Sequence, residues 1–377
     1  MKYYKWSILP VAALLLVTLL MACSQPAPSP TPAPSPSPTA SPKPSATASP
    51  TATPTAKPVA KQQWRFASTE EGTYGFEIAV GIAKVANQYN PNTELTILTA
   101  KSAPVTNALY EKNELDTAFG SQQTLLEVYT NKGIYEQSPI KYRVYQGVYM
   151  FTSDHFFVIK AGKTGINSLA DLAGKKVFPY QRGGGAYDTH KLILTTLGIW
   201  DKMTDRQMGR DEAADALQTG AIDAVGAYTT GQASLPGWVA NIDVKTQVQT
   251  VTPSAAEQEI IKKIPTIANL MVPASVFSKP VGVKDIWAYS NFYGYYFGPN
   301  EDTERVYGIV KSWYEHGKEL VSISPGLSQF EKSGLQMNIA AIDSTPDLPV
   351  HPGVAKYYKE KGIWKSNWKI GEIYPRK

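Results

Sequence analysis

The sequence predicts an α/β protein of two lobes, preceded by an export signal and an extended tether. From Trp64 onward, stretches with strand character alternate with stretches whose apolar residues recur at helical spacing, a pattern typical of a parallel sheet. This part of the chain is about 300 residues long, more than one hydrophobic core usually serves. The alternation also occurs in two separate cycles, which favours two lobes.

The first cycle is predicted from hydrophobic periodicity between residues 64 and 133. A strand at 64–69 precedes a helix over 77–89, whose buried face is expected to carry Ile78, Ile82, Val85 and Ala86. A strand at 94–100, a helix over 103–115, a strand at 116–120 and a helix over 121–133 follow. We expect Gly133 to close the last helix.

Two apolar strands, at 142–151 and 155–162, lead into the second cycle. This cycle is predicted to contain a helix at 168–174, a strand at 175–180, helices at 185–199 and 211–220, and a strand at 221–228. A strand at 285–298 then precedes a long amphipathic helix over 303–321, which presents Val306, Ile309, Val310, Trp313 and Tyr314 on one face. We expect 64–155 and 286–377 to form lobe 1 and 156–285 to form lobe 2, although the pattern leaves 253–284 open.

The N-terminal end predicts a lipoprotein. Two lysines precede the apolar run 8–21, which has the length of a signal-peptide core and is shorter than a membrane-spanning helix. The stretch Leu20–Cys23 resembles the bacterial lipobox, so residues 1–22 are expected to be a lipoprotein signal peptide and Cys23 to carry the lipid. The alternative is an uncleaved membrane anchor that ends in a stray cysteine.

Composition restricts what the rest of the chain can do. Residues 23–63 are nearly all Pro, Ser, Thr and Ala, too poor in apolar bulk to fold, and predict a disordered tether. The net charge of +5 is accounted for by lysines of the signal segment and the tether, so the folded part lacks the excess of basic residues that nucleic-acid binding needs. With one cysteine in the chain, no disulfide is expected.

Three strand-to-helix turns are candidate ligand contacts, because ligands collect at the carboxyl ends of parallel strands, where helix N-termini offer free amides. The first turn supplies Gly72, Thr73 and Tyr74, and the second supplies Ser121 and Gln122. The third supplies Arg182, Gly183, Gly184, Gly185, Ala186 and Tyr187, and its three glycines permit a nest of N–H groups that suits a small anion. Tyr228, at the end of a predicted strand, is a further candidate.

Each candidate has a plainer interpretation. Thr73 and Ser121 also fit helix N-caps, and the glycines also fit the needs of a turn. Arg182 either pairs with a carboxylate ligand or lies on the surface. The sequence AGKTG at 161–165 lacks the first glycine of a P-loop, no GxSxG or HExxH motif occurs, and the histidines are scattered. We therefore expect no catalytic residue, no metal or other cofactor, and no enzyme activity.

The order of these motifs resembles one family. EGTYGFEIAVGIAKVANQY, at 71–89, is similar to the GGTYY-type opening of the TAXI solute-binding proteins of TRAP (tripartite ATP-independent periplasmic) transporters. The resemblance continues through INSLADLAGKKVFPYQRGGGAYDTHKLILTTLGI and EAADALQTGAIDAV to LPVHPGVAKYYKEKGIW, its most specific part. It covers about 64–364 and departs from the family at Glu71 and at Gly184–Tyr187, where the family has GSGT.

The resemblance implies a type II periplasmic-binding-protein fold, in which the chain crosses twice between two lobes. The ligand would be a small organic anion, such as glutamate or a dicarboxylate, delivered to a TRAP permease of fused small and large subunits. By the same resemblance, the first two turns would contact it from one lobe and Gly183–Tyr187 from the other. The protein is then expected to be extracytoplasmic, lipid-anchored and monomeric. The alternatives are an ABC-transporter substrate-binding lipoprotein, a ligand-sensing lipoprotein partner of a membrane kinase, and an exported enzyme. Which anion binds is left open.

Overall fold

The structure is a computed structural model that describes residues 61–376, so the predicted signal peptide, Cys23 and nearly all of the predicted tether lie outside the described residues.

The strands are β1 (Gln62–Thr69), β2 (Thr93–Ala100), β3 (Thr117–Ser121), β4 (Tyr145–Lys160), β5 (Lys176–Phe178), β6 (Thr204–Asp205), β7 (Ala224–Thr230), β8 (Val248–Val251), β9 (Ala268–Pro273) and β10 (Asp285–Phe297). The α-helices are α1 (Tyr74–Tyr89), α2 (Val105–Glu111), α3 (Gln122–Thr130), α4 (Gly185–Thr196), α5 (Ala213–Thr219), α6 (Gly237–Lys245), α7 (Ala255–Ile261), α8 (Thr303–Glu315), α9 (Gly317–Ile323), α10 (Ser328–Ser344) and α11 (Pro352–Glu360). Short 3₁₀ helices lie at Gly133–Tyr135, Leu169–Leu172, Trp200–Lys202, Arg210–Glu212, Ala274–Val276 and Pro325–Leu327.

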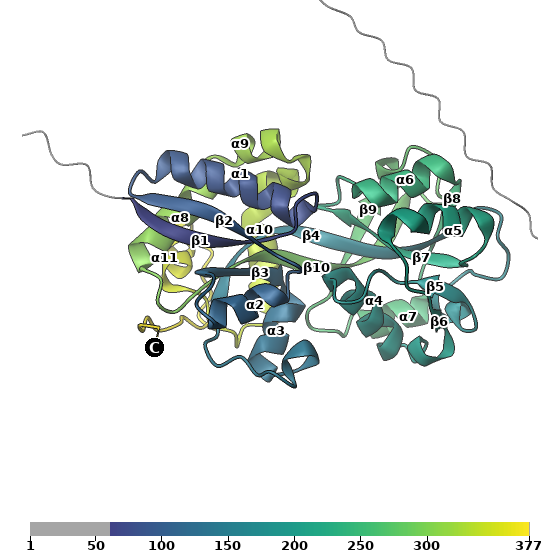
Figure 1. Ribbon diagram of the computed structural model, residues 1–377, viewed down its shortest axis with the longest axis horizontal. Helices are drawn as coiled ribbons and strands as arrows, with labels where there is room; N and C mark the ends of the chain where they lie inside the picture. The colour runs from purple at the N-terminus through teal and green to yellow at the C-terminus, as the bar shows by residue number, and fades with distance from the viewer. Residues whose placement is uncertain (1–60, 377) are drawn as a thin grey trace, which may run out of the picture. The chain divides into compact units, whose positions relative to one another are not determined.

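The first lobe contains the two-stranded sheet β1-β2 and, beside it, the strands β3-β10-β4 of an eight-stranded sheet (Figure 1). β1 and β2 pair in parallel, with Gln62 opposite Thr93, whereas β10 pairs antiparallel with β3 and with the first part of β4. β1 lies beside β3, because the Ala67 N–H donates to Thr117 Oγ1 at 2.9 Å. The carboxyl ends of β1 and β3 therefore meet at one edge, where the first two predicted turns begin.

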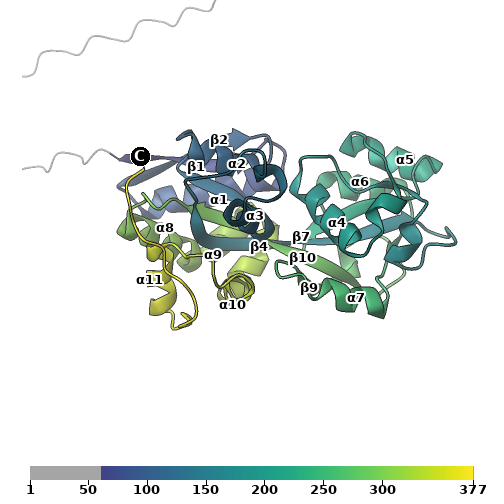
Figure 2. The ribbon, with the colours of Figure 1, turned by 90° about the horizontal axis from the view of Figure 1, so that it is seen from below.

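The eight-stranded sheet continues into the second lobe, where its strands lie in the order β6-β5-β7-β4-β8. β5 pairs in parallel with β6 and β7, and the second part of β4 pairs antiparallel with β7 and β8. β9 adds to the free edge of β10. In each lobe, three parallel strands are followed by an antiparallel strand that arrives from the other lobe, so the chain crosses twice, through β4 and through β10 (Figures 1 and 2).

β4 differs from the sequence prediction, which placed two strands at 142–151 and 155–162. The structure has one strand of 16 residues. The polar residues between the two apolar runs stay in the ladder because they are buried and bonded: Asp154 Oδ2 accepts from Thr229 Oγ1 at 3.0 Å and from the Gln232 N–H at 2.9 Å. These bonds offset the cost of burying a polar side chain.

The hydrophobic cores follow the two sheets. One core draws on residues 64–151 and 292–368 and includes the faces predicted for the helices at 77–89 and 303–321. Two further cores draw on residues 156–289. The predicted lobe boundaries at 155 and 286 stay predictions, because both fall inside strands that run from one lobe into the other.

Two predicted helices end earlier than expected. The helix expected to close at Gly133 ends at Thr130, where Asn131 adopts a left-handed φ of 49°, a conformation that asparagine tolerates. The helix predicted over 303–321 is interrupted at His316, whose φ and ψ of −114° and 31° separate α8 from α9. Within residues 61–376, no helix is long and apolar enough to cross a membrane.

Candidate functional site

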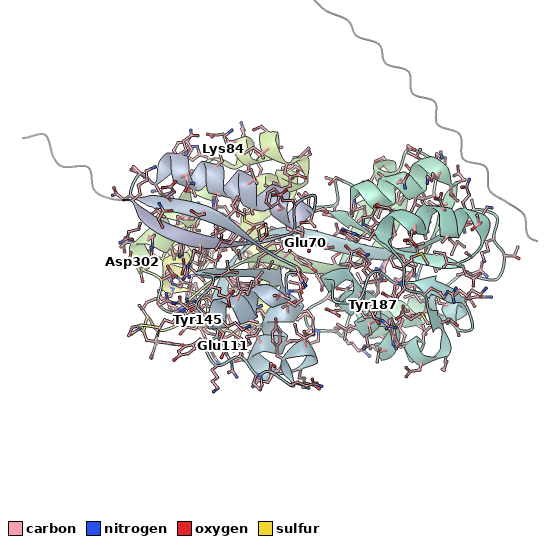
Figure 3. All side chains as sticks on the ribbon, in the orientation of Figure 1. Glu70, Lys84, Glu111, Tyr145, Tyr187 and Asp302 are labelled. Atoms are coloured by element: carbon pink, nitrogen blue, oxygen red, sulfur yellow. The ribbon has the colours of Figure 1, made fainter. Side chains whose placement is uncertain are left out.

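The first predicted turn, 70–75, lies between β1 and α1. Figure 3 labels Glu70 at this turn, on the side of the first lobe that faces the second. Gly72 is exposed, with a φ of +75°. The Thr73 hydroxyl caps α1, since it accepts from the Phe76 N–H at 3.3 Å, and it also lies 2.6 Å from Thr69 Oγ1. Thr73 therefore acts as an N-cap in this structure, and the free N–H groups of the first turn of α1 are the donors left for a ligand.

The Tyr74 side chain turns toward the crossing strand β4. Its ring meets Phe151 edge-on at 5.0 Å, and burial raises the pKa of its phenol. A Cβ at residue 326 would overlap the Tyr74 hydroxyl, so Gly326 is needed for this contact. Tyr74 thus joins α1 to β4 and to the 3₁₀ helix Pro325–Leu327.

The second predicted turn contains Ser121 and Gln122. Ser121 Oγ accepts from the Thr124 N–H at 3.1 Å and so caps α3. The Gln122 side chain is 0% exposed and points into the first lobe, where its Nε2 donates to Thr345 Oγ1 at 2.8 Å and its Oε1 accepts from Ser344 Oγ at 3.0 Å. The Gln122 side chain is therefore already occupied within the first lobe.

The third predicted turn precedes α4. Gly183 has a φ of +82°, and Gly184 occupies the N-cap position without a side chain. Arg182 lies on the surface with 65% of its side chain exposed, and its Nη2 lies 2.9 Å from Asp205 Oδ2. Tyr187, labelled in Figure 3, donates to the same Asp205 oxygen at 3.0 Å. Ala186 is buried, so the glycine backbone is the part of this turn that remains free.

Tyr293 of the crossing strand β10 brings the second and third turns together. Tyr293 pairs directly with Ser121 in the ladder between β10 and β3. From the other lobe, a Cβ at Gly185 would overlap the Tyr293 hydroxyl, so Gly185 packs against this phenol. Burial raises the pKa of Tyr293, while the nearby Ser121 hydroxyl lowers it. Turns of both lobes therefore approach one side chain.

Sequence reasoning missed Tyr293 because its stretch, NFYGYYFG, was interpreted as strand core. The ring does pack as core residues do: it stacks on Phe151 at 5.4 Å and lies 6.0 Å from Phe119. Its register opposite Ser121 and the contact of its hydroxyl with Gly185 place it between the two turns. A tyrosine in a crossing strand beside a small residue of the partner strand is the signal that could have found it.

The Tyr228 side chain lies in the second lobe, half-buried near the end of β7. Its ring centroid is 6.1 Å from that of Tyr180, which follows β5. Burial raises the pKa of the Tyr228 phenol well above its usual value. The Tyr180 ring in turn lies against Gly184, where a Cβ would come within 2.7 Å of the ring. Tyr228 and the third turn are thus connected through Tyr180.

Two carboxyl groups lie near Tyr293, one on each lobe. Burial raises the pKa of Asp188, in the first turn of α4, to about 6. Burial also raises the pKa of Glu127 in α3, and the charge of Asp188 raises it further. Both charges raise the pKa of Tyr293. The helices that supply free amides therefore also bring negative charge, and its amount depends on pH.

Two histidines lie buried beneath the turns. His190 Nδ1 is 2.7 Å from the Tyr289 hydroxyl, while neither ring nitrogen of His155 has a hydrogen-bond partner among the described residues. Burial lowers the pKa of His155 to about 3 and that of His190 well below its usual value. Both are neutral near pH 7. Across residues 61–376, no group of three metal-ligating side chains is found.

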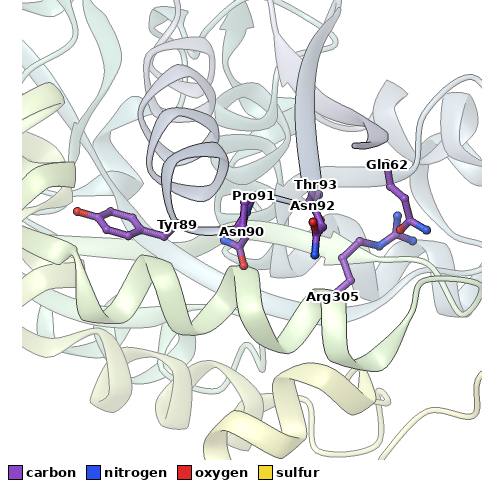
Figure 4. A pocket seen from close by; sticks show the side chains of 7 residues that line it. All are labelled: Gln62, Tyr89, Asn90, Pro91, Asn92, Thr93 and Arg305. Atoms are coloured by element: carbon purple, nitrogen blue, oxygen red, sulfur yellow. The ribbon is translucent and has the colours of Figure 1, made fainter. Parts of the chain in front are cut away.

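A pocket of about 450 Å³ lies elsewhere on the first lobe (Figure 4). It is lined by Gln62, Tyr89, Asn90, Pro91, Asn92, Thr93 and Arg305. Gln62 and Thr93 begin β1 and β2, so this pocket lies at the amino ends of these strands, away from the predicted turns. Its arginine is already paired with Glu301 at 2.8 Å. We do not assign it a ligand.

The repeated sheets, the two crossing strands and the turns at the strand ends define a type II periplasmic-binding-protein fold. Within this class, the chain belongs to the NMT1-like family, whose sequence pattern matches residues 66–362. The structure is similar to the periplasmic aliphatic sulphonate binding protein of Escherichia coli, with 12% identity and a TM-score of 0.40, over 80% of this chain and 84% of that one. It is also similar to a probable amino-acid ABC transporter extracellular-binding protein of Bacillus subtilis, with 14% identity and a TM-score of 0.44, over 72% and 98% of the two chains.

Proposed function

We propose that this protein is an extracytoplasmic solute-binding lipoprotein that captures a small organic anion between its lobes and delivers it to the permease of a TRAP transporter. The sequence features behind this proposal are the lipobox that ends in Cys23 and the family resemblance over about 64–364. The proposal includes no catalytic step, metal or other cofactor.

One observation carries the proposal: Ser121 of the first lobe and Gly185 of the second lobe both approach Tyr293. α3 and α4 begin at these turns, so the free N–H groups of two helices belong to the same region. A small anion can accept hydrogen bonds from both helices only when the lobes are close together. Its binding energy would then favour the closed arrangement.

Replacing Gly185 with alanine is expected to weaken anion binding at least about tenfold. The added Cβ would overlap the Tyr293 hydroxyl, so the turn must move away from the first lobe. Isothermal titration of the full chain, purified in detergent, with glutamate, succinate and taurine measures the effect. Gly308→Ala in α8 is the matched control, because its Cβ would meet only the Asn90 side chain.

An unchanged dissociation constant in Gly185→Ala would reject this turn as a ligand contact. If no anion bound the unaltered chain, the proposed function itself would fail. The transporter class needs a second measurement: uptake driven by an ion gradient supports a TRAP permease, whereas uptake that requires ATP indicates an ABC transporter. A response that persists in a strain without the permease would indicate the sensing role instead.

Anion affinity is also expected to fall as the pH rises through about 6. Asp188 is neutral below its raised pKa of about 6 and negatively charged above it, and its charge reaches Tyr293. The repulsion predicts a loss of roughly twofold to tenfold, the range for a charge several ångströms away. Titrations at pH 5 and pH 8 measure this ratio.

In Asp188→Asn the ratio of the anion affinity at pH 5 to that at pH 8 should approach one. The control Asp201→Asn, at an exposed residue, should keep the ratio of the unaltered chain. A ratio that survives in Asp188→Asn would show that another group controls the pH dependence.

A further inference from the structure

Arg210 lies in the segment after β6 and forms no ion pair with an acidic side chain of the described residues. It is half-buried, and no carboxylate within the described residues lies within ion-pair distance of it, whereas Arg65 and Arg182 pair with Asp116 and Asp205. Its Nη1 donates to the Tyr180 hydroxyl at 3.3 Å. A partly buried guanidinium keeps its charge at all relevant pH values. Burial lowers the pKa of Arg210, whereas the neighbouring Tyr180 and Asp211 raise it, so its charge is only partly compensated.

A second donor without a partner lies in the same place. Trp238 in α6 is 7% exposed, and its Nε1 has no hydrogen-bond partner among the described residues. Its ring centroid is 5.6 Å from that of Tyr180 and 6.2 Å from that of Tyr228. An indole N–H and a guanidinium only donate hydrogen bonds, so a ligand that carries acceptor atoms suits both groups. If Arg210 were only a solvated surface residue, its lack of an ion pair would be explained. The buried Trp238 N–H would still be unexplained.

These side chains converge where this fold class is expected to bind ligands. Tyr180 follows β5 and Tyr228 lies near the end of β7, two strands that run parallel with their carboxyl ends at one edge. Tyr180 also has a φ of +134°, a strained conformation for an aromatic residue. That backbone places its ring between Gly184 and Trp238.

We propose that Arg210, Trp238, Tyr180 and Tyr228 form the second lobe's half of the binding site, and that this site selects a carboxylate or sulfonate attached to a flat apolar body. The inference rests on the proposed function and adds its ligand class. The Arg210 fork binds two oxygens of the head group, and the Trp238 N–H donates to an oxygen as well. The rings of Tyr180 and Tyr228 contact the flat body.

The test compares four probes on the full chain by isothermal titration: benzoate, benzenesulfonate, succinate and glutamate. We expect at least one of the two aromatic anions to bind about tenfold or more tightly than both aliphatic ones. Replacing Arg210 with glutamine should then weaken aromatic-anion binding about 10- to 100-fold, the loss typical of a charge-assisted pair of hydrogen bonds. Trp238→Phe, which keeps a ring and removes the N–H, should weaken it by about fivefold.

Arg206→Gln is the matched control, because Arg206 is exposed and lies four residues away in the same segment. It makes the same change in net charge, and we expect binding within twofold of the unaltered chain. Thermal unfolding of each variant shows whether a loss of binding is a loss of folding, and Trp238→Phe keeps the proposal testable if Arg210→Gln unfolds.

The outcomes separate this inference from the function on which it rests. If succinate or glutamate binds tightly and neither aromatic anion does, the ligand class is wrong while the proposed function stands. If Arg210→Gln and Trp238→Phe keep full affinity, this half-site is wrong. If neither these four anions nor taurine binds the unaltered chain, both proposals fail.

Discussion

Replacing Trp313 with alanine is expected to lower the free energy of unfolding by about 3 to 5 kcal/mol, the cost of removing a large buried aromatic side chain. Trp313 in α8 is 0% exposed. Its ring lies 6.1 Å from that of Phe66 and 6.3 Å from that of Phe297, and its Nε1 donates to the Ile82 carbonyl at 3.0 Å. The side chain therefore connects α8, which follows the second crossing, to β1, β10 and α1.

Urea unfolding followed by circular dichroism, with linear extrapolation to zero denaturant, measures this loss. Trp364→Ala serves as the comparison, because Trp364 is half-exposed near the C-terminal end, and its loss should be clearly smaller. A loss below about 1 kcal/mol for Trp313→Ala would contradict the docking of α8 on this core, because even modest cavities in a packed interior cost more.

Acidification is expected to destabilise the fold through its buried histidines. The folded-state pKa of His155 is about 3, whereas an unfolded histidine titrates near 6.5. Below pH 6.5 the unfolded chain binds a proton that the folded chain excludes, so stability is full above 6.5 and falls as the pH falls. Between pH 6.5 and 5, His155 alone accounts for about 2 kcal/mol at 1.36 kcal/mol per unit. His351, with a pKa lowered to about 4 by burial, acts in the same direction.

Asp188 and Glu301 oppose this effect. Burial raises their pKa values to about 6 and about 7, so acidification stabilises the folded state through these two groups. The comparison must therefore be made between variants. His155→Phe keeps a buried ring and removes the titration, so its stability relative to the parent should improve by about 2 kcal/mol between pH 6.5 and 5. Any packing penalty appears equally at both pH values. Parallel stability curves for the two proteins would contradict the prediction.

Local pattern was sufficient for most of the elements near the site. The apolar spacing of Ile78, Ile82 and Val85 predicted α1, and the alternation of strand and helix predicted both sheets. It failed where a distant partner decides the conformation. Asp154 looks like a break between two strands until Thr229 and the Gln232 N–H satisfy it, and these residues are far away in the sequence.

The candidate site also contains some residues that local sequence predicts and others that it does not. Gly183–Gly185 and the caps Thr73 and Ser121 could be found from the sequence, because a strand-to-helix turn needs small or capping residues nearby in the chain. Tyr293 and Arg210 were not found, because local sequence alone does not distinguish a core tyrosine or a surface arginine from a residue at a ligand site. The roles proposed for them depend on strand register and on the absence of an ion pair at Arg210.

Backbone propensity and hydrophobic periodicity act over a few residues, and so the order of strands, helices and glycine turns could be derived from the chain alone. The meeting of Ser121 and Gly185 at Tyr293 depends on how β4 and β10 pass through both lobes. Such contacts join residues from separate parts of the chain, and packing and hydrogen bonding between the folded elements select them.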